Sequence, residues 1–380
     1  IAALAAIAGL YMMTQQADSS VETQFQEFIS TYRKSYLSAE TYNFRLGVFQ
    51  QNLGEIAAMN AANPDATYAV NEFADWTVDE RTALLGFKPK KVASSKHHRF
   101  TLGHPTKKDM NWVEDHETTP VKDQKSCGSC WAFSATETLE STYALWKGLE
   151  GDAMVKFSEQ QSVDCVRGSP YGSEGCNGGW MDDVFDYAAA GNKFCTEADY
   201  PYTARDGKCD TSKCTIDVGV TGRVNIPEDD MDRLLEAIET TPVAVAVDAN
   251  SFFFYAGGVH KCTSKNLNHG VQADGFHIDS TDGDYILVRN SWGPRWGADG
   301  FIKITTDGSG DCGIALAASY PTHEGLNDDN KKCPDSDDEP DKDKNCMCTY
   351  GKKCDKTKAH GKDKDGCDDE AAGGEFGLCG

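Results

Sequence analysis

The chain has 380 residues, of which 60 are acidic and 37 are basic, so its formal net charge is −23. Such an acidic chain is a poor partner for nucleic acid or for an anionic membrane surface, because both attract a basic face. Hydrophobic residues make up 39% of the sequence, which is enough to bury a core and too much for a disordered chain.

The first element is an uncharged apolar run over residues 1–13. It is too short to span a bilayer and is typical of the apolar part of a secretory signal. We therefore interpret residues 1–17 as a signal-peptide remnant; the alternative is a buried strand or helix at the start of a domain. No second long apolar run follows, so we expect a mature protein without a membrane anchor that is secreted or reaches a lysosome or vacuole.

Residues 18–104 contain no cysteine, and their apolar side chains recur at helical spacing. A first predicted helix includes Phe25 and Phe28, and a second includes Phe49. Residues 87–108 are polar and basic without periodicity. They predict an exposed connector, which is a preferred site of proteolytic cleavage.

Residues 105–322 mix helical and strand patterns and contain nine of the 15 cysteines. Residues 131–149 have a helical pattern, whereas residues 242–247, 285–289 and 301–305 have the composition of strands. A helix followed later by strands favours the α+β class, in which the two kinds of element are segregated.

Residues 323–380 are acidic, contain six cysteines and have few large apolar side chains. They form either a small module held by disulfides or a mostly disordered tail. Alternating oxygen-bearing residues at 341–345 and 363–370 resemble calcium loops, but the twelve-residue EF-hand pattern is missing. We therefore favour a solvated acidic surface over calcium binding.

The main candidate nucleophile is Cys130, which comes directly before the helical pattern. A thiol at a helix N-terminus lies at the positive end of the helix dipole, which favours the reactive thiolate. Gln124 lies six residues upstream. Its side-chain amide and the backbone N–H of Cys130 are expected to donate to a developing oxyanion.

A cysteine nucleophile needs an imidazole partner and a third group that orients the imidazole. His269 precedes one possible strand and Asn290 follows another. If these strands are neighbours, Asn290 accepts a hydrogen bond from the His269 ring and directs the ring toward Cys130. Trp292 is then expected to shield that hydrogen bond from water.

Other polar residues of the region receive structural interpretations. We interpret His260 as a surface-loop residue, His277 as a strand residue and Asp274 as a solvated charge. Paired cysteines at metal-ligand spacing are missing apart from Cys127 and Cys130. The sequence therefore predicts no metal and no cofactor.

The segment Cys127–Trp131 reads CGSCW, and later segments read GCNGG at 175–179, YPY at 200–202 and SYP at 319–321. Together they resemble the papain-like cysteine proteases, in particular the cathepsin L-like branch. The resemblance implies an α+β fold of two lobes, one helical and one strand-rich and β-barrel-like, with the active-site cleft between them. It also implies a cysteine endopeptidase that hydrolyses peptide bonds.

The resemblance also implies a role for each site residue. Cys130 is the nucleophile, His269 is the acid/base and Asn290 orients it. Gln124 is the oxyanion donor. The residues implied in substrate binding are Gly178, Gly179, Trp180, Met181, Leu267, Ala317 and Trp292.

Trp180, Met181, Leu267 and Ala317 match positions that line the S2 pocket in the family, and they are apolar or small. The resemblance therefore implies a bulky hydrophobic side chain at P2. Ala317 at the pocket floor, in place of an acid, argues against arginine there. The span between Cys165 and Cys209 contains no histidine, and this favours endopeptidase over carboxydipeptidase action. The other readings are a non-catalytic binding or inhibitory scaffold, which requires the loss of a catalytic group, and a peptide ligase on the same fold.

The N-terminal part resembles the family's inhibitory propeptide. Two motifs carry the match, with Thr41 in place of a leading Glu and Ala69 in place of the usual Gly. The resemblance implies that residues 18–104 lie along the cleft in the non-productive direction, that residues 105–322 are the catalytic domain, and that the mature chain begins within 104–110. The expected partners are polypeptide substrates and the chain's own propeptide, and we expect a monomer. The matching motif residues are Arg45, Phe49, Asn52, Ile56, Asn60, Asn71, Phe73 and Asp75.

The cysteines are assigned through the same resemblance. It pairs Cys127 with Cys176, Cys165 with Cys209, and Cys262 with Cys312. Cys195 and Cys214 remain, and we predict an additional bridge between them. The six cysteines of the acidic C-terminal extension, residues 323–380, form an even set whose pairing the sequence leaves open. Cys130 is then the odd thiol.

Overall fold

The computed structural model describes residues 21–90, 105–278, 283–324, 347–349 and 376–378. The interpreted signal segment, most of the 87–108 connector and nearly all of the C-terminal extension, including its candidate calcium loops, lie outside the described residues. None of the helices in the described part is long and apolar enough to cross a bilayer.

The elements follow one another in the order helix-rich, then strand-rich. Residues 21–32 are helical. The helices after them are α2 (Ala39–Ala62), α3 (Val78–Thr82), α4 (Cys130–Lys147), α5 (Glu159–Cys165), α6 (Met181–Ala189) and α7 (Met231–Ile238), with 3-10 turns at Gly151–Ala153 and Gly175–Asn177. The strands are β1 (Ala66–Tyr68), β2 (Asp109–Asn111), β3 (Val220–Asn225), β4 (Val243–Val247), β5 (Tyr255–His260), β6 (His269–His277), β7 (Tyr285–Arg289), β8 (Phe301–Thr305), β9 (Ala318–His323), β10 (Met347–Thr349) and β11 (Phe376–Leu378).

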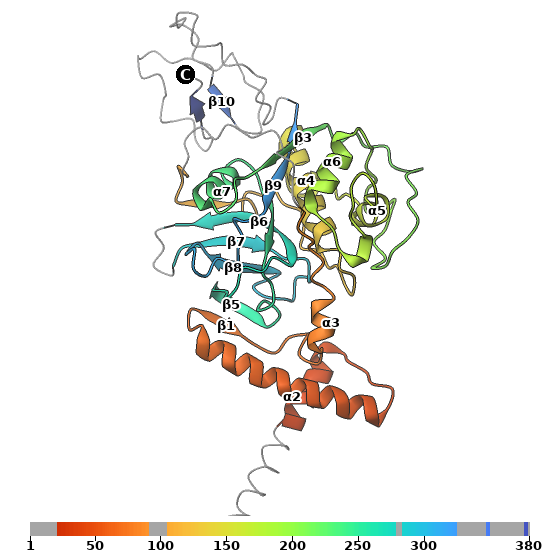
Figure 1. Cartoon of the computed structure of the whole chain (residues 1–380), viewed down its shortest axis with the longest axis vertical. Helices are drawn as coiled ribbons and strands as arrows, with labels where there is room; N and C mark the ends of the chain where they lie inside the picture. Colours follow the sequence, from red (N-terminus) through yellow and green to blue (C-terminus); the bar gives the residue numbers. More distant parts are fainter. Residues whose placement is uncertain (1–20, 91–104, 279–282, 325–346, 350–375, 379–380) are drawn as a thin grey trace, which may run out of the picture.

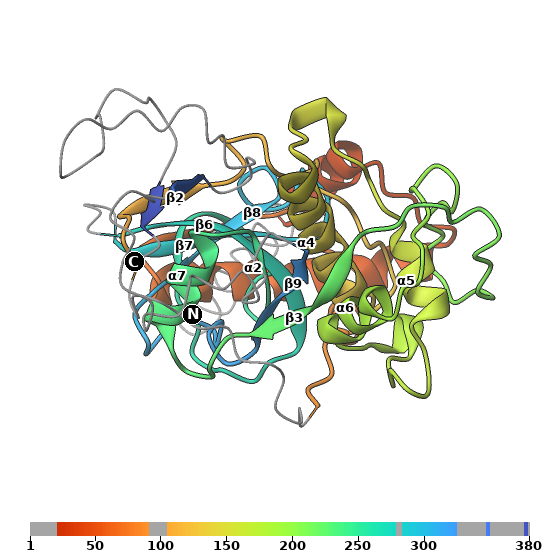
Figure 2. The same cartoon turned by 90° about the horizontal axis from the view of Figure 1, so that it is seen from above.

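The catalytic part has two lobes, as expected. Helices α4, α5 and α6 lie on one side and the large sheet lies on the other, and both views show this division (Figures 1 and 2). The lobes meet where α4 packs against β6, and there the Ser134 hydroxyl donates to the Val271 carbonyl at 2.6 Å. The buried helix α4 thus forms the contact between the helical lobe and the strand lobe.

The strand lobe is an open sheet, which corrects the expectation of a β-barrel-like lobe. Eight strands run in the order β1-β5-β8-β7-β6-β4-β9-β3, and β2, the ninth strand of the sheet, pairs with β6. A barrel closes only when its first and last strands pair. Here one edge strand, β1, belongs to the N-terminal segment, and the other, β3, pairs only with β9. The two edge strands of this sheet, β1 and β3, are therefore not paired with each other, and the sheet stays open.

The N-terminal segment 21–90, called the prosegment below, folds around α2 beneath the two lobes (Figure 1). Phe49 and Ile56 of α2 are buried, as the helical pattern predicts. Phe44 of the same helix is 55% exposed, and the Arg45 guanidinium lies over its ring.

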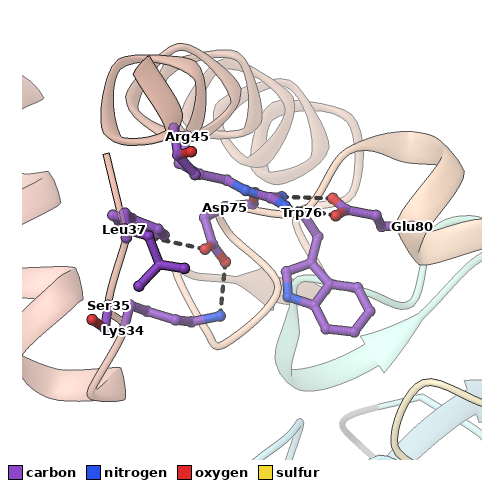
Figure 3. A pocket seen from close by; sticks show the side chains of 9 residues that line it. Lys34, Ser35, Leu37, Arg45, Asp75, Trp76 and Glu80 are labelled. Atoms are coloured by element: carbon purple, nitrogen blue, oxygen red, sulfur yellow. Dashed lines mark hydrogen bonds and ion pairs between the residues drawn. The ribbon is translucent and has the colours of Figure 1, made fainter. Parts of the chain in front are cut away.

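Polar side chains join the parts of the prosegment to one another, including α2 to α3. The Arg45 guanidinium donates two hydrogen bonds, at 2.6 and 2.7 Å, to the Glu80 carboxylate. Asp75 accepts from Lys34 and from the Tyr36 hydroxyl, each at 2.8 Å. Figure 3 shows these contacts around a surface groove of the prosegment. The motif residues Arg45 and Asp75 thus each have charged or polar partners within the prosegment.

The prosegment docks on the strand lobe through backbone and aromatic contacts. β1 pairs with β5 in antiparallel register, and the Asn71 side chain donates to the Phe253 carbonyl at 2.6 Å. The Phe73 ring packs edge-on against both Phe253 and Trp292, with centroids at 5.6 and 5.4 Å. One continuous apolar core therefore joins the prosegment to the strand lobe.

Four disulfides are present among the cysteines of residues 105–324 that the structure describes, and they are the four expected pairs. They join Cys127 to Cys176, Cys165 to Cys209, Cys195 to Cys214, and Cys262 to Cys312. Among the cysteines whose side chains the structure describes, Cys130 is the one outside a disulfide. In the extension, β10 and β11 form a two-stranded antiparallel pair.

Candidate active site

Cys130 is the first residue of α4 and is completely buried. The preceding residue, Ser129, makes no side-chain cap to the helix, so the first N–H groups of α4 stay available to the thiol. The Gly86 N–H donates to the Cys130 sulfur at 3.2 Å. The candidate nucleophile thus lies at a helix N-terminus, as predicted, and a residue of the prosegment covers it.

His269 begins β6 and Asn290 directly follows β7, and these two strands are antiparallel neighbours. The His269 Nε2 atom lies 2.8 Å from Asn290 Oδ1. That oxygen also accepts from the Ser291 N–H at 2.8 Å, so His269 Nε2 is the donor. His269 Nδ1 is buried without a partner among the described residues, which leaves it free to accept a proton.

Trp292 covers this pair, as predicted. Its side chain is 2% exposed, and its ring centroid lies 5.0 Å from that of His269. On its other face the indole stacks on Phe253 at 4.5 Å. The hydrogen bond between His269 and Asn290 is therefore shielded from water, which strengthens it.

The Gln124 amide has a fixed orientation. Its Oε1 accepts from the Ser291 hydroxyl at 2.7 Å, and its Nε2 donates to the Cys127 carbonyl at 2.8 Å and to the Leu84 carbonyl at 2.9 Å. Leu84 belongs to the prosegment. The predicted oxyanion donor, Gln124, is therefore hydrogen-bonded to a backbone carbonyl of the prosegment.

The prosegment continues along the loop that precedes α6. Phe87 and Gly179 form a parallel bridge. The Gly179 N–H donates to the Gly86 carbonyl at 2.9 Å, and the Lys88 N–H donates to the Gly179 carbonyl at 3.0 Å. A Cβ atom on Gly178 would lie 2.5 Å from the Gly86 carbonyl oxygen. A glycine at 178 is therefore required for this close backbone approach.

The apolar pocket residues gather around Phe87. The Phe87 ring packs against Trp180 with centroids 5.0 Å apart, and Met181, Leu267 and Ala317 belong to the same cluster. Trp180, Met181 and Ala317 also line a small cavity of about 80 Å³. All the residues expected to bind substrate thus lie near Cys130 or along segment 84–88.

Burial favours the neutral form of both members of the candidate pair. Burial raises the pKa of the Cys130 thiol to about 11, although N–H groups from Gly270, Gly86 and Trp131 oppose this shift. Burial lowers the pKa of His269 to about 4, against the opposing effect of Asn290. Desolvation penalises both charged forms, so a thiolate and an imidazolium are both disfavoured in this state.

Comparison with known proteins agrees with this geometry. Residues 105–322 match the papain family cysteine protease, and residues 25–80 match the cathepsin propeptide inhibitor domain. The chain belongs to the papain family of cysteine proteases. It is a cathepsin L-like cysteine endopeptidase that is made as a zymogen, with its own prosegment as intramolecular inhibitor.

Relatives in this papain family cover most of the chain. Digestive cysteine proteinase 2 of Homarus americanus is 38% identical over 316 residues, covering 80% of this chain and 95% of the relative. Human cathepsin L2 is 36% identical over 327 residues, covering 82% and 96%. The structure of digestive procathepsin L 3 of Tenebrio molitor superposes with a TM-score of 0.69 at 33% identity, covering 80% of this chain and 99% of that one.

Lys125 departs from the family pattern beside Gln124, where a Gly is common. The Lys125 backbone has a φ of 54°, in the left-handed region that favours glycine. Its side chain is exposed and pairs with Asp123. The substitution therefore strains the backbone slightly and leaves the Gln124 amide in place.

Two sequence interpretations in this papain-family domain are wrong. His260 is completely buried on β5, where its Nδ1 lies 2.8 Å from the Tyr68 hydroxyl of the prosegment. Asp274 is completely buried on β6, 3.4 Å from Arg289 Nε. Each polar side chain found a partner that is distant in sequence, and nothing in the local pattern predicts such a partner. His277 lies at the end of β6, as expected.

Three functional contacts were missed. Ser291 fixes the Gln124 amide, and Leu84 and Gly86 occupy the positions beside Gln124 and Cys130. Ser291 directly follows Asn290, so its place next to the site was open to inference. Leu84 and Gly86 had no such signal, because only the course of the prosegment brings them there.

Proposed function

We propose that Cys130 is the nucleophile, His269 the acid/base, Asn290 the orienting residue and Gln124 the oxyanion donor. One observation carries the proposal. The prosegment places a peptide carbonyl on the Gln124 amide and a peptide N–H on the Cys130 sulfur. The site thus binds peptide backbone in contact with a thiol, which is what a peptide hydrolase requires.

The first step is loss of the prosegment. Departure of segment 84–88 lets water reach Cys130 and His269, which removes the largest cause of their shifted pKa values. The thiol proton then moves to His269 Nδ1, and the thiolate and the imidazolium stabilise each other. The positive end of the α4 dipole and the N–H groups around the sulfur favour the thiolate further.

Peptide hydrolysis follows in two half-reactions. The thiolate of Cys130 attacks the substrate carbonyl carbon, and the oxyanion accepts hydrogen bonds from Gln124 Nε2 and the Cys130 N–H. His269 gives its proton to the leaving amine as the C–N bond breaks. His269 then takes a proton from water, which attacks the thioester and releases the acid and the thiol.

We further propose that the substrates are polypeptides with a bulky hydrophobic P2 residue. Support comes from Phe87, whose ring already occupies the apolar cluster of Trp180, Met181, Leu267 and Ala317. Gly178 and Gly179 are proposed to hold the substrate backbone. Substrates are proposed to run opposite to segment 84–88.

The organisation of the chain is part of the proposal. Residues 1–17 are a signal remnant, 18–104 the propeptide, 105–322 the catalytic domain and 323–380 an extension of unassigned role. The mature enzyme is a monomer that begins within 104–110, and it works in a lysosome or vacuole or outside the cell.

The test uses proenzyme activated at mildly acidic pH and a fluorogenic peptide with Leu or Phe at P2. Cys130→Ala and His269→Ala should each lower kcat by at least about 10³-fold. His277→Ala is the matched control, because His277 lies on the same strand at the surface, 2.8 Å from Asp109, and should keep full activity. Undiminished hydrolysis by Cys130→Ala would disprove the assignment.

A further inference from the structure

Near residue 90, two lysines of the prosegment contact two acidic residues of the helical lobe. Lys88 pairs with Glu174, and both side chains are about half exposed. Lys90 differs, because its ammonium contacts both the Asp183 carboxylate and the Tyr171 carbonyl. The Asp183 side chain is only 9% exposed. One of these two contacts is therefore a surface ion pair and the other is a built site.

The cation site is continuous with the proposed P2 pocket. Asp183 lies in the first turn of α6 and accepts from the Ser173 hydroxyl. The same hydroxyl accepts from the Trp180 N–H at 3.1 Å. Ser173 thus connects the carboxylate to the backbone of the residue that packs on Phe87. The Asp183 carboxylate is therefore held in place by Ser173 of the catalytic domain as well as by Lys90 of the prosegment.

Removal of the prosegment empties this site. Asp183 and the Tyr171 carbonyl then lack the ammonium that neutralised them. The carboxylate is still held by the Ser173 hydroxyl but has lost its countercharge, so it favours a cation that can reach it. The substrate lies along the same loop and is the natural source of that cation.

We propose that the mature enzyme uses Asp183 and the Tyr171 carbonyl to bind the Lys or Arg side chain of a substrate residue at P4 or P5. The proposal rests on the proposed function above. Phe87 marks the P2 position, and Lys90 lies three residues further along the extended prosegment. A substrate that runs in the opposite direction brings P5 to this level, and the long side chain of a P4 residue also reaches it.

The charges around Asp183 predict how the preference depends on pH. Burial raises the pKa of Asp183, while Lys90 and Ser173 oppose the shift and neighbouring Asp182 adds to it. Tyr171, the other titratable side chain beside the site, has a raised pKa because of its own burial and is neutral in the working range. A cation binds the ionised carboxylate and not the protonated acid, so cation selectivity should rise with pH.

The experiment compares peptides with Leu at P2 that carry Lys, Arg or norleucine at each position from P3 to P6. The activated wild-type enzyme should have kcat/KM about tenfold higher for Lys or Arg than for norleucine at P4 or P5. Asp183→Asn should remove this ratio and Asp183→Glu should restore part of it. The ratio should also grow as the pH is raised from 4.5 to 6.5.

Two matched variants separate the site from general charge effects. Asp186→Asn removes one charge from the same helix at a carboxylate that contacts Arg223 instead, and Glu174→Gln removes the exposed partner of Lys88. Both should keep most of the ratio at P4 and P5. Labelling by a thiol-directed epoxide counts the folded active sites in each variant.

The outcomes distinguish the two proposals. Hydrolysis of the norleucine peptides without any Lys or Arg preference, or a preference that Asp183→Asn leaves intact, overturns the cation site and leaves the peptidase assignment standing. A wild-type enzyme that is labelled but hydrolyses none of the peptides overturns both.

Discussion

The prosegment and the catalytic domain use charged residues in opposite ways. In the prosegment each paired cation has one carboxylate of its own, as in Arg45 with Glu80, whose side chains are 22% and 39% exposed, and in Arg81 with Glu55. In the catalytic domain one buried cation serves two carboxylates. Lys122 binds Glu140 and Glu159, and Arg289 lies near Glu137 and Asp274.

This difference gives the two regions opposite responses to acid. The Arg45 hydrogen bonds lower the pKa of Glu80 to about 2, so its stabilising contribution is present above pH 4.5 and is lost as the pH falls through about 2. Burial raises the pKa of Asp274 to about 7 and also raises that of Glu159. Their contribution is full at low pH and is lost as the pH rises through these values.

The interface between the two regions responds like the prosegment. Burial lowers the pKa of His260 to about 4, and nearby Asp248 opposes the shift. The neutral ring is therefore preferred, and its stabilising effect is present above pH 6.5 and is lost as the pH falls through about 4. Acid thus weakens the docking of β1 while the catalytic domain gains stability, which is the order of events that a zymogen needs.

The largest expected effect is at the point where the two regions touch most closely. A Cβ atom on Gly86 would lie 1.9 Å from the Gly128 carbonyl oxygen, so Gly86→Ala should displace segment 84–88 at a cost of about 3 kcal/mol or more. Labelling of Cys130 by a thiol-directed epoxide in intact proenzyme at pH 7 should become at least about 100-fold faster. An unchanged rate would show that this segment does not protect the thiol.

The second prediction concerns the catalytic domain alone. Asp274→Asn should remove the share of Asp274 in the loss of unfolding free energy between pH 5 and pH 8, which is roughly 3 kcal/mol for one such carboxyl, whereas the share of Glu159 should remain. Urea unfolding of the inhibitor-blocked mature enzyme at both pH values measures it. Asp307→Asn, in an exposed loop where hydrogen bonds from Ser309 lower the pKa, should leave the difference unchanged. A full pH slope in Asp274→Asn would contradict the buried-cluster explanation.

The third prediction concerns the interface. His260→Gln replaces a titrating ring by a neutral amide. Lowering the pH to 4.5 should therefore weaken the docking of the prosegment by about 1–2 kcal/mol less in the variant than in the wild type. The pH at half-maximal activation of the proenzyme should fall, as followed by cleavage of the fluorogenic peptide. His277→Gln, at the surface, serves as the control. Activation at an unchanged pH would remove His260 from the acid response.

The smallest effect should come from α2. A Cβ atom on Gly54 meets no atom within 4 Å, so Gly54→Ala should stabilise the prosegment by about 0.5–1 kcal/mol through helix propensity. Activation should be slower at a given acidic pH. Gly47→Ala, at an equally open position of the same helix, should have the same effect. Faster activation in either variant would contradict the view that prosegment stability limits release.

Much of the site followed from local sequence. Cys130 starts a helix, His269 and Asn290 lie at the ends of adjacent strands, and the predicted strands at 285–289 and 301–305 formed within the same limits. These features depend on periodicity and on chain ends, which neighbouring residues determine. The open sheet and the burial of His260 and Asp274 were not predicted, because they depend on partners such as Tyr68 and Arg289 that are far away in sequence.

The sequence by itself determined the chemistry of this protein. The residue types around Cys130, His269 and Asn290, and their spacing, specify a thiol with a base and an orienting amide. Only the tertiary structure decided whether the thiol and the imidazole are charged or neutral. Segment 84–88 passes over Cys130 and Gln124 and excludes water, and the resulting desolvation keeps the thiol and the imidazole neutral until the prosegment leaves.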